Sequence, residues 1–297
     1  MFFLGIDGGG SKTEAVIIDK DMKVLGKGRA GPADIFNSDR ETVKNNLISA
    51  IDKALEEADI SYENLNFGGF GLPAVGEIKD AEAIYKKVIK EFFPKEFIVF
   101  NDVRGALEGA FPYEDGAVLL VGTGIMVMAK IGNEIVRIDG WGEHAGDCGS
   151  GYDIGRECLR YIFKMYDGRL EKSLMYDMVE ENVEEIIRKT KGVNSRKYIA
   201  SFSKIVCSSA EKNDKYALRI LDNALEEWKL SILALKKKLK SNQIKLAVVG
   251  GLKNCKILYN KFLSWAEEEY WLKLSEPLYE PCIGSAILAM KEYEKLF

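Results

Sequence analysis

Seven consecutive residues from Asp7 combine a carboxylate, three glycines, two hydroxyls and a lysine in the string DGGGSKT. Glycines let backbone N–H groups approach phosphate oxygens, and a carboxylate can hold a hydrated magnesium ion. The hydroxyl of Thr13 can donate to a terminal phosphate. The string predicts a polyphosphate cradle formed by Asp7, Gly9, Gly10, Lys12 and Thr13. Taken alone, it is equally typical of a flexible hairpin.

Two further glycine motifs follow apolar runs later in the chain. Gly122-Thr123-Gly124 comes after the run 117–121 and offers a second cradle for phosphate. Gly250-Gly251 comes after the run 245–249, just before Asn254, and offers a flat surface for a nucleotide. Each motif alone is more often a structural turn than a binding loop. Together, in this order and each at a strand end, they point far more specifically to a site for a nucleotide and its phosphates.

Asn101 and Asp102 follow a third apolar run, 97–100. A carboxylate at a strand end can accept the proton of an attacking hydroxyl, and its reference pKa of about 3.9 keeps it ionised at neutral pH. Phosphoryl transfer requires positioning more than a strong base. We therefore predict that Asp102 is the catalytic base. The alternative is that Asn101-Asp102 caps a helix over 103–110.

The composition excludes several classes of function. The chain has 297 residues, 47% of them apolar, which is enough for a large core and, at about 150 residues per domain, for two domains. Its 42 Lys and Arg against 46 Asp and Glu leave a net charge of −4, which disfavours a nucleic-acid binder. His144 is the only histidine, so a multi-histidine metal site is excluded.

The pattern of apolar residues and turns predicts an α/β protein that begins with a hairpin. We expect strands over 2–6 and 13–18 joined by the glycine turn, and a helix over about 43–58 that begins with a capping box at Ser38 and Glu41. A second helix is expected over 80–93, with Ile84, Val88 and Phe92 facing inward. Buried strands are expected over 66–71 and 97–100.

The second half repeats this arrangement after a break near 112–115. Strands are expected over 117–121, 125–131 and 245–249, with a two-residue hairpin at Gly132-Asn133. The segment from 153 to about 241 is expected to be mainly helical, with a long helix over roughly 216–240. Two related halves, each with a mixed sheet covered by helices, are therefore predicted.

Five segments in a fixed order resemble the N-acetylglucosamine kinases and related BadF/BadG/BcrA/BcrD ATPases. They are DGGGSKT, FNDVRGAL, VGTG, GWGEHAGDCGSGYDIG and VVGGLKN. The resemblance implies two ribonuclease H-like domains of the actin-like ATPase type, with the nucleotide in a cleft between them. The domains would span 1–115 and 116–297, the second with a helical insertion. A last helix near 282–297 would pack back on the first domain.

The resemblance also implies residue roles in a sugar pocket. Trp141, Asp147 and Gly151 match positions that line it, and an indole face and a carboxylate suit a pyranose; a core or hinge role for Trp141 is equally open. Asp34 stands where the family commonly has a sugar-binding asparagine, and Asn37 is the alternative. The substrate-binding residues predicted in all are Asp34, Asn37, Asn101, Trp141, Asp147 and Gly151.

By this resemblance the chain is expected to be an ATP-dependent kinase of an amino sugar or hexose. Mg²⁺, held by Asp7 through water, would bridge the β- and γ-phosphates. Acceptors at Asp34 and Asp147 would favour a free ammonium group, so that glucosamine competes with N-acetylglucosamine. One alternative is a 2-hydroxyacyl-CoA dehydratase activator with an iron–sulfur cluster at Cys148 and Cys158. Another is a nucleotide-dependent sensor without kinase activity.

The cysteines and the N-terminus predict a cytoplasmic protein. The five cysteines are odd in number and lack C-x-x-C spacing, which favours a reducing compartment over a disulfide framework; they are Cys148, Cys158, Cys207, Cys255 and Cys282. Asp7 interrupts any signal-peptide core, and the uncharged run 116–129 is shorter than the roughly 20 residues of a membrane helix. The expected partner is a small sugar, without nucleic acid or membrane, and a homodimer through the helical region is left open.

Overall fold

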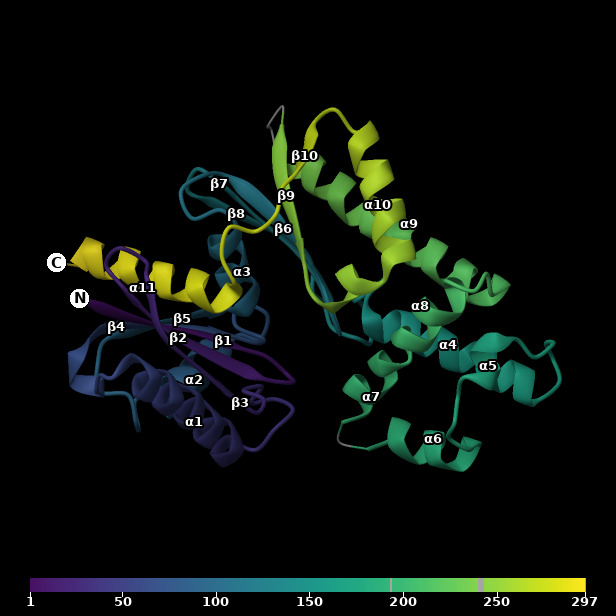
Figure 1. Ribbon diagram of the computed structural model, residues 1–297, viewed down its shortest axis with the longest axis horizontal. Coiled ribbons are helices and arrows are strands. Elements are labelled where there is room, and N and C mark those ends of the chain that lie inside the picture. The colour runs from purple at the N-terminus through teal and green to yellow at the C-terminus, as the bar shows by residue number, and fades with distance from the viewer. Residues whose placement is uncertain (193, 240–242, 297) are drawn as a thin grey trace. The chain divides into compact units, whose positions relative to one another are not determined.

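The computed structural model describes residues 1–192, 194–239 and 243–296. The chain forms two compact units. Unit 1 comprises Met1–Glu114 with Glu276–Phe297, and unit 2 comprises Asp115–Ser275. Each unit is built on a five-stranded sheet with helices against it (Figure 1). The predicted α/β class with two related halves is confirmed.

The sheet of unit 1 has the order β3-β2-β1-β4-β5. Strands β1, β2 and β3 are antiparallel neighbours, whereas β4 and β5 run parallel to β1. The glycine turn joins β1 to β2 with Gly8 opposite Thr13, which confirms the predicted hairpin. The strands are β1 (Phe2–Gly8), β2 (Thr13–Asp19), β3 (Val24–Ala30), β4 (Leu65–Leu72) and β5 (Phe97–Asn101).

Helices cover both faces of this sheet because β1 and β2 are apolar on both sides. Leu4 and Ile6 face a core shared with α1 and α2, whereas Phe3 faces a core shared with α11. Gly5 and Gly69 let α11 lie directly on the strands, since a Cβ on either would come within 2.2 Å of a helix carbonyl oxygen. The helices are α1 (Arg40–Ala58), the 3₁₀ helix η1 (Tyr62–Asn64), α2 (Ala81–Ile89), α3 (Asp102–Ala110) and α11 (Pro281–Leu296).

Two local predictions in unit 1 are wrong. Helix α1 is capped by Asp39, whose carboxylate accepts from the N–H of Thr42 at 2.9 Å, rather than by a box of Ser38 and Glu41. In α2, Ile84 is 38% exposed while Tyr85 is fully buried. Val88 is buried as predicted, and Phe92 packs against the same core, so only Ile84 is misplaced; Tyr85 takes the inward position expected for it.

Unit 2 repeats the topology of unit 1, with the sheet order β10-β9-β6-β7-β8. Strand β6 pairs antiparallel with β7, which pairs antiparallel with β8, and β9 and β10 run parallel to β6. Gly132-Asn133 forms the predicted two-residue connection between β7 and β8. The strands are β6 (Gly116–Val121), β7 (Ile125–Ile131), β8 (Glu134–Asp139), β9 (Ile244–Val249) and β10 (Leu272–Leu274).

The helical region of unit 2 is confirmed, and its long helix α9 carries Lys236, Lys237 and Lys238 in its last turn, where cations suit the helix dipole. Residues 240 and 241, where the predicted region ends, lie outside the described residues. The helices are α4 (Gly151–Tyr166), α5 (Leu174–Asp177), α6 (Val183–Thr190), α7 (Ser195–Ser201), α8 (Ser203–Ala210), α9 (Lys215–Lys238), η2 (Gly251–Asn254) and α10 (Lys256–Glu268).

One pair of cysteines forms a disulfide that the number and spacing of the cysteines did not indicate. Cys207 of α8 is bonded to Cys255, which follows η2, with 5.5 Å between their Cα atoms. Sequence spacing gave no sign of this pair because the two residues meet only through the packing of α8 and α10. Cys158 and Cys282 are buried thiols, and Cys148 is an exposed one.

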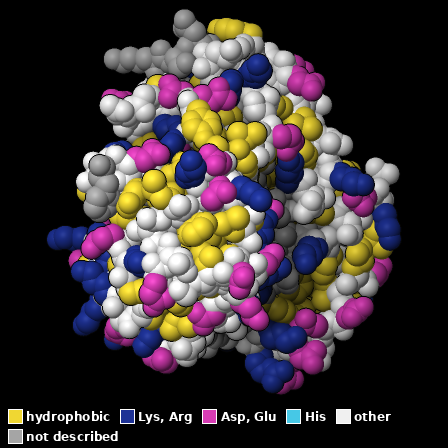
Figure 2. All heavy atoms as spheres, turned by 60° about the vertical axis from the view of Figure 1, so that its left-hand side comes forward, with side chains coloured by type: hydrophobic (Ala, Val, Ile, Leu, Met, Phe, Trp, Pro, Cys, Tyr) yellow, Lys and Arg dark blue, Asp and Glu magenta, His cyan; other side chains and the backbone are white. Residues whose placement is uncertain are grey.

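Two surface properties bear on partners. Within the described ranges, no helix combines the length and the hydropathy needed to cross a lipid bilayer. On the face drawn in Figure 2, Lys and Arg side chains are intermixed with Asp and Glu. A basic stripe that could follow a nucleic-acid backbone is not visible on that face.

Candidate active site

The carboxyl ends of three parallel strands bring the predicted catalytic residues of unit 1 to one edge. Asp7 near the end of β1 is level with Gly71 of β4, and Leu72 is level with Asn101, the last residue of β5. Asp102 follows as the first residue of α3. Ligands of open α/β sheets bind outside the carboxyl ends of strands, so this edge is the expected place for a site.

Asp7 and Asp102 interact electrostatically although they lie far apart in the sequence. Burial, followed by repulsion from Asp7 and Glu77, raises the pKa of Asp102 to about 7. Burial and repulsion from Glu14 raise the pKa of Asp7 to about 6, against the opposing attraction of Lys12. A carboxylate with a pKa near 7 is suited to accept a proton at neutral pH.

Asn101 supports the site rather than opening into it. Its side-chain carbonyl accepts from the N–H of Val103 at 3.1 Å and so caps α3. Its side-chain NH₂ donates to the carbonyl of Val75 and to Glu77, each at 3.1 Å. These bonds tie the loop after β4 to the end of β5. Asn101 is therefore the N-cap of α3, as the alternative interpretation of Asn101-Asp102 predicted. Its side chain is occupied by these bonds, so nothing here supports the predicted contact with substrate.

The first glycine turn departs from the prediction at Thr13. The Thr13 hydroxyl is fully buried and donates to the carbonyl of Gly31 at 2.7 Å, so its proton is not offered to a phosphate. Lys12 pairs with Glu14 at 2.6 Å. The N–H of Gly9 donates to the carbonyl of Lys12 at 2.9 Å and closes the turn. Gly10 at the tip is exposed.

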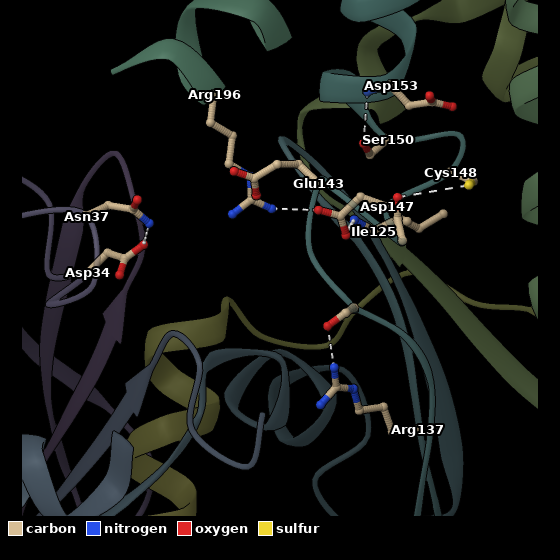
Figure 3. A network of polar contacts seen from close by, with 12 residues as sticks. Asp34, Asn37, Ile125, Arg137, Glu143, Asp147, Cys148, Ser150, Asp153 and Arg196 are labelled. Carbon is tan, nitrogen blue, oxygen red and sulfur yellow. Dashed lines mark hydrogen bonds and ion pairs between the residues drawn. The ribbon is translucent and has the colours of Figure 1, made fainter. Parts of the chain in front are cut away.

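The predicted sugar residues Asp34 and Asn37 lie together beside this turn. Asp34 is buried, and its Oδ2 accepts from Asn37 Nδ2 at 2.7 Å (Figure 3). The same Oδ2 lies 3.8 Å from the point where a Cβ on Gly10 would stand. The exposed Asn37 therefore extends from the Asp34 carboxylate at the rim of the first glycine turn.

Tyr85 of α2 holds this loop, a role that the sequence did not reveal. Its hydroxyl donates to the carbonyl of Ala33 at 3.0 Å and accepts from the N–H of Ile35 at 3.2 Å. Tyr85 thus fixes the backbone on both sides of Asp34. A buried tyrosine on a helix is ordinarily read as core, and only the long-range bonds distinguish it.

In unit 2 the second glycine motif is bonded to the N-terminus of α4. The N–H of Gly151 donates to the carbonyl of Gly122 at 2.8 Å, and that of Tyr152 to Thr123 at 3.1 Å. A Cβ on Gly151 would lie 2.8 Å from the Gly122 carbonyl oxygen. Gly151 is therefore required for backbone contact with the glycine loop rather than for lining a sugar pocket.

The third glycine motif lies at the same edge of the unit 2 sheet, since β9 is the parallel neighbour of β6. Gly250 has φ +107°, and a Cβ there would lie 2.4 Å from the carbonyl oxygen of Val121. Gly251 is exposed and has open space where a Cβ would stand. Asn254, also exposed, ends η2. Gly250 is structural, whereas Gly251 and Asn254 present a surface.

Asp147 is buried behind the second glycine motif instead of facing outward. It is 2% exposed, and its Oδ2 pairs with Arg196 Nη2 at 2.7 Å (Figure 3). Its Oδ1 accepts weakly from the N–H of Ile125 at 3.4 Å. Arg196 also pairs through Nε with Glu143 at 3.1 Å. No motif in the sequence pointed to Arg196, which lies in α7 far along the chain.

Trp141 is 69% exposed, so its alternative reading as a core residue is wrong. The guanidinium of Arg137 lies over the indole, 4.5 Å from the ring centroid. Arg137 also donates to the carbonyl of Gly140 (Figure 3). The ring is thus supported by a cation and by the loop that precedes it, with part of the indole left open to a ligand.

A family model described as the BadF/BadG/BcrA/BcrD ATPase family matches residues 4–289. The chain belongs to this ATPase family. Among related proteins, an N-acetylmuramic acid/N-acetylglucosamine kinase from Clostridium acetobutylicum is 31% identical over 98% of this chain and 99% of its own length. A glucosamine kinase from Vibrio cholerae is 27% identical over 79% of this chain and 80% of its own.

Solved structures agree with this BadF/BadG/BcrA/BcrD family fold. A Chromobacterium violaceum protein, provisionally assigned as an N-acetylglucosamine kinase, has a TM-score of 0.82 at 19% identity, covering 97% of this chain and 98% of its own. A ROK family glucokinase from Streptomyces griseus has a TM-score of 0.62 at 16% identity, covering 98% and 100%. At these identities the likeness shows that the fold is shared.

Proposed function

We propose that this member of the family is a kinase that transfers the γ-phosphate of ATP to a hydroxyl of an amino sugar. The observation that carries the proposal is the carboxylate pair of unit 1, with Asp102 at the start of α3 and its pKa raised to about 7 beside Asp7. The relatives named for N-acetylglucosamine and glucosamine kinase activity support the sugar class.

Asp102 orients the acceptor hydroxyl and takes its proton as the hydroxyl oxygen attacks the γ-phosphorus. The bond between that phosphorus and the β,γ-bridging oxygen breaks, and ADP leaves. Because the transition state is loose, positioning of the hydroxyl contributes more than basicity. The N–H of Val103 bonds to Asp102 Oδ1 at 2.9 Å and fixes the carboxylate during this step.

Asp7 suits a role beside Mg²⁺. Burial is the main cause of the raised pKa values of Asp7 and Asp102, and repulsion adds to it, from Glu14 on Asp7 and from Asp7 on Asp102. A divalent cation relieves such repulsion. We assign Asp7 as the group that holds the hydrated ion. When bound, Mg²⁺ neutralises charge on the β- and γ-phosphates.

The nucleotide is assigned to the glycine motifs of both units. Gly9 and Gly10 serve the terminal phosphates from unit 1, and Gly122-Thr123-Gly124 serves them from unit 2. Gly251 and Asn254 form the surface for the adenosine.

The sugar is assigned to Trp141 and to the Asp34–Asn37 pair. Asp34 and Asp147 were both expected to attract an ammonium group on the sugar. Because Arg196 already neutralises Asp147, we now assign this attraction to Asp34 alone. Asp34→Asn removes that negative charge while keeping the size of the side chain. If Asp34 favours glucosamine, the ratio of kcat/KM for glucosamine to that for N-acetylglucosamine falls in the variant. An unchanged ratio removes the idea.

The dehydratase-activator alternative fits the cysteines poorly. Cys148 is exposed, whereas Cys158 is buried in the hydrophobic core of unit 2. Burial raises the pKa of the Cys158 thiol well above its usual range, and a cluster ligand has to be a thiolate. Neither the activator nor the sensor is favoured by a specific contact.

The kinase proposal is tested by ADP release from MgATP with a panel of neutral, amino, N-acetylated and acidic sugars. Products are identified by mass spectrometry and NMR, which also reveal the hydroxyl attacked. We expect release of ADP that depends on an amino sugar. ADP release that no sugar stimulates would contradict the proposal and favour a nucleotide-dependent sensor.

A further inference from the structure

A cluster of three charged side chains stands directly behind the second glycine motif. Arg196 reaches from α7 to Asp147 and Glu143, which belong to the loop between β8 and α4. A Cβ on Gly124 would lie 2.9 Å from Arg196 Nη2 and 3.1 Å from Asp147 Oδ2. The ion pair therefore touches the backbone of Gly124 (Figure 3).

Backbone hydrogen bonds connect this cluster to the rest of the glycine loop. The carboxylate of Asp147 accepts from Ile125, the residue that follows Gly124. On the other side, Gly122 and Thr123 accept from the first N–H groups of α4. Every residue from 122 to 125 thus contacts either the Arg196–Asp147 pair or the N-terminus of α4.

The charge of Asp147 depends on Arg196. Burial is the largest influence on Asp147 and raises its pKa, while Arg196 and the N–H of Ile125 lower it and Glu143 raises it. An isolated carboxylate that is 2% exposed would be costly to ionise. Arg196 provides the compensating charge, and its planar guanidinium also fixes the direction of the carboxylate.

We propose that Arg196 is a positioning residue for ATP: through Asp147 it keeps the loop Gly122–Ile125 in the conformation that receives the phosphates. This inference rests on the proposed function and extends it to the helical insertion that supplies α7. The alternative is that Asp147 binds the sugar directly. Its burial and its contacts with Gly124 and Ile125 favour the phosphate loop.

The test variant is Arg196→Met, which keeps the length of the side chain and removes its charge. Without Arg196 the pKa of Asp147 rises further, so Asp147 becomes neutral as the pH falls. The ratio of variant to wild-type kcat/KM for ATP should therefore rise severalfold between pH 6 and pH 9. Asp102 is present in both proteins, so its ionisation affects both kcat/KM values in the same way and cancels in their ratio.

Two further variants assign the effect to Asp147. Arg196→Lys retains the positive charge and should restore a nearly flat ratio. The double variant with Arg196→Met and Asp147→Asn cannot titrate at this position, so its ratio should be low at every pH. The matched control is Arg160→Met, because Arg160 forms an exposed ion pair with Glu157 on α4. For this control, the ratio of kcat/KM for ATP to the wild-type value should stay near one at every pH.

Binding of a non-hydrolysable ATP analogue, measured by calorimetry at pH 6 and pH 9, gives a readout independent of turnover. We expect the dissociation constant of Arg196→Met to exceed that of the wild type most at pH 6. Should this variant not fold, Glu143→Gln provides the test with the opposite sign. It removes a repelling charge, so its ratio to wild type should be highest at low pH.

A pH-independent ratio for Arg196→Met, or an effect confined to the KM of the sugar, would overturn the inference while leaving the kinase proposal intact. A pH slope that persists in the double variant would overturn it as well. In contrast, a wild-type protein that binds the analogue but releases no ADP with any sugar would refute the kinase proposal alone. The calorimetric comparison would then still decide the role of Arg196.

Discussion

Two adjacent glycines, Gly250 and Gly251, are expected to respond in opposite ways to the same substitution. Gly250 has φ +107°, a region in which L side chains are strained, and a Cβ there would lie 2.4 Å from the carbonyl oxygen of Val121. The backbone strain costs about 1–3 kcal/mol, and the displaced strand β6 adds a similar amount. Gly250→Ala should therefore lower the free energy of unfolding of unit 2 by about 3 kcal/mol or more.

Gly251→Ala is the matched control for stability and the test variant for function. A Cβ at Gly251 meets no atom within 4 Å, so the free energy of unfolding should change by less than about 0.5 kcal/mol. If adenosine lies on this surface, the added methyl group displaces it. The KM for ATP should then rise severalfold in Gly251→Ala while the KM for the sugar stays near the wild-type value.

Urea unfolding followed by tryptophan fluorescence measures the stability effect in the correct unit. All 4 tryptophans of the chain lie in unit 2: Trp141, Trp228, Trp265 and Trp271. The transition midpoint of Gly250→Ala should move to lower urea, and that of Gly251→Ala should not. Equal midpoints for Gly250→Ala and wild type, or an unchanged KM for ATP in Gly251→Ala, would refute the respective assignment.

Three further outcomes follow from single contacts. Reduction of the Cys207–Cys255 bond, which spans a sequence separation of 48 residues, should lower the unfolding free energy by up to about 4 kcal/mol; a double serine variant that still responds to reductant would contradict this. Tyr85→Phe removes the hydroxyl bonded on both sides of Asp34 and should raise the KM for the sugar but not for ATP, as initial rates would show. Because Asp102 must be ionised to act as a base and its pKa is raised to about 7, kcat/KM at limiting ATP should fall as the pH drops below 7. A flat profile from pH 5 to 8 would exclude this role.

The sequence predicted the parts of the fold that depend on local patterns. Strands with apolar runs, the glycine turns after them and the Gly132-Asn133 hairpin are set by neighbouring residues, so periodicity was enough to place them. The choice between Ser38 and Asp39 as cap, and between Ile84 and Tyr85 as the inward residue, was decided by packing. Such one-residue differences depend on atoms that a linear pattern does not contain.

The candidate site was predictable where one residue type carries the chemistry and not where long-range contacts decide its use. Asp7 and Asp102 could each be assigned because each carboxylate lies at the end of a predicted apolar strand. Thr13 and Asp147 were expected to face ligands, but Gly31 and Arg196 engage them instead. These partners lie in other segments, and only the folded chain shows that they are close.

Phosphoryl transfer by Asp102→Asn, compared with its affinity for ATP, tests the central claim most directly. Asparagine keeps the size of the side chain but cannot accept the proton of the hydroxyl, so the rate of sugar phosphorylation should fall by about 10²–10⁴. The dissociation constant for ATP should remain near the wild-type value, because the glycine motifs are unchanged. A variant that phosphorylates the sugar at the wild-type rate would contradict the assignment of Asp102 as the catalytic base.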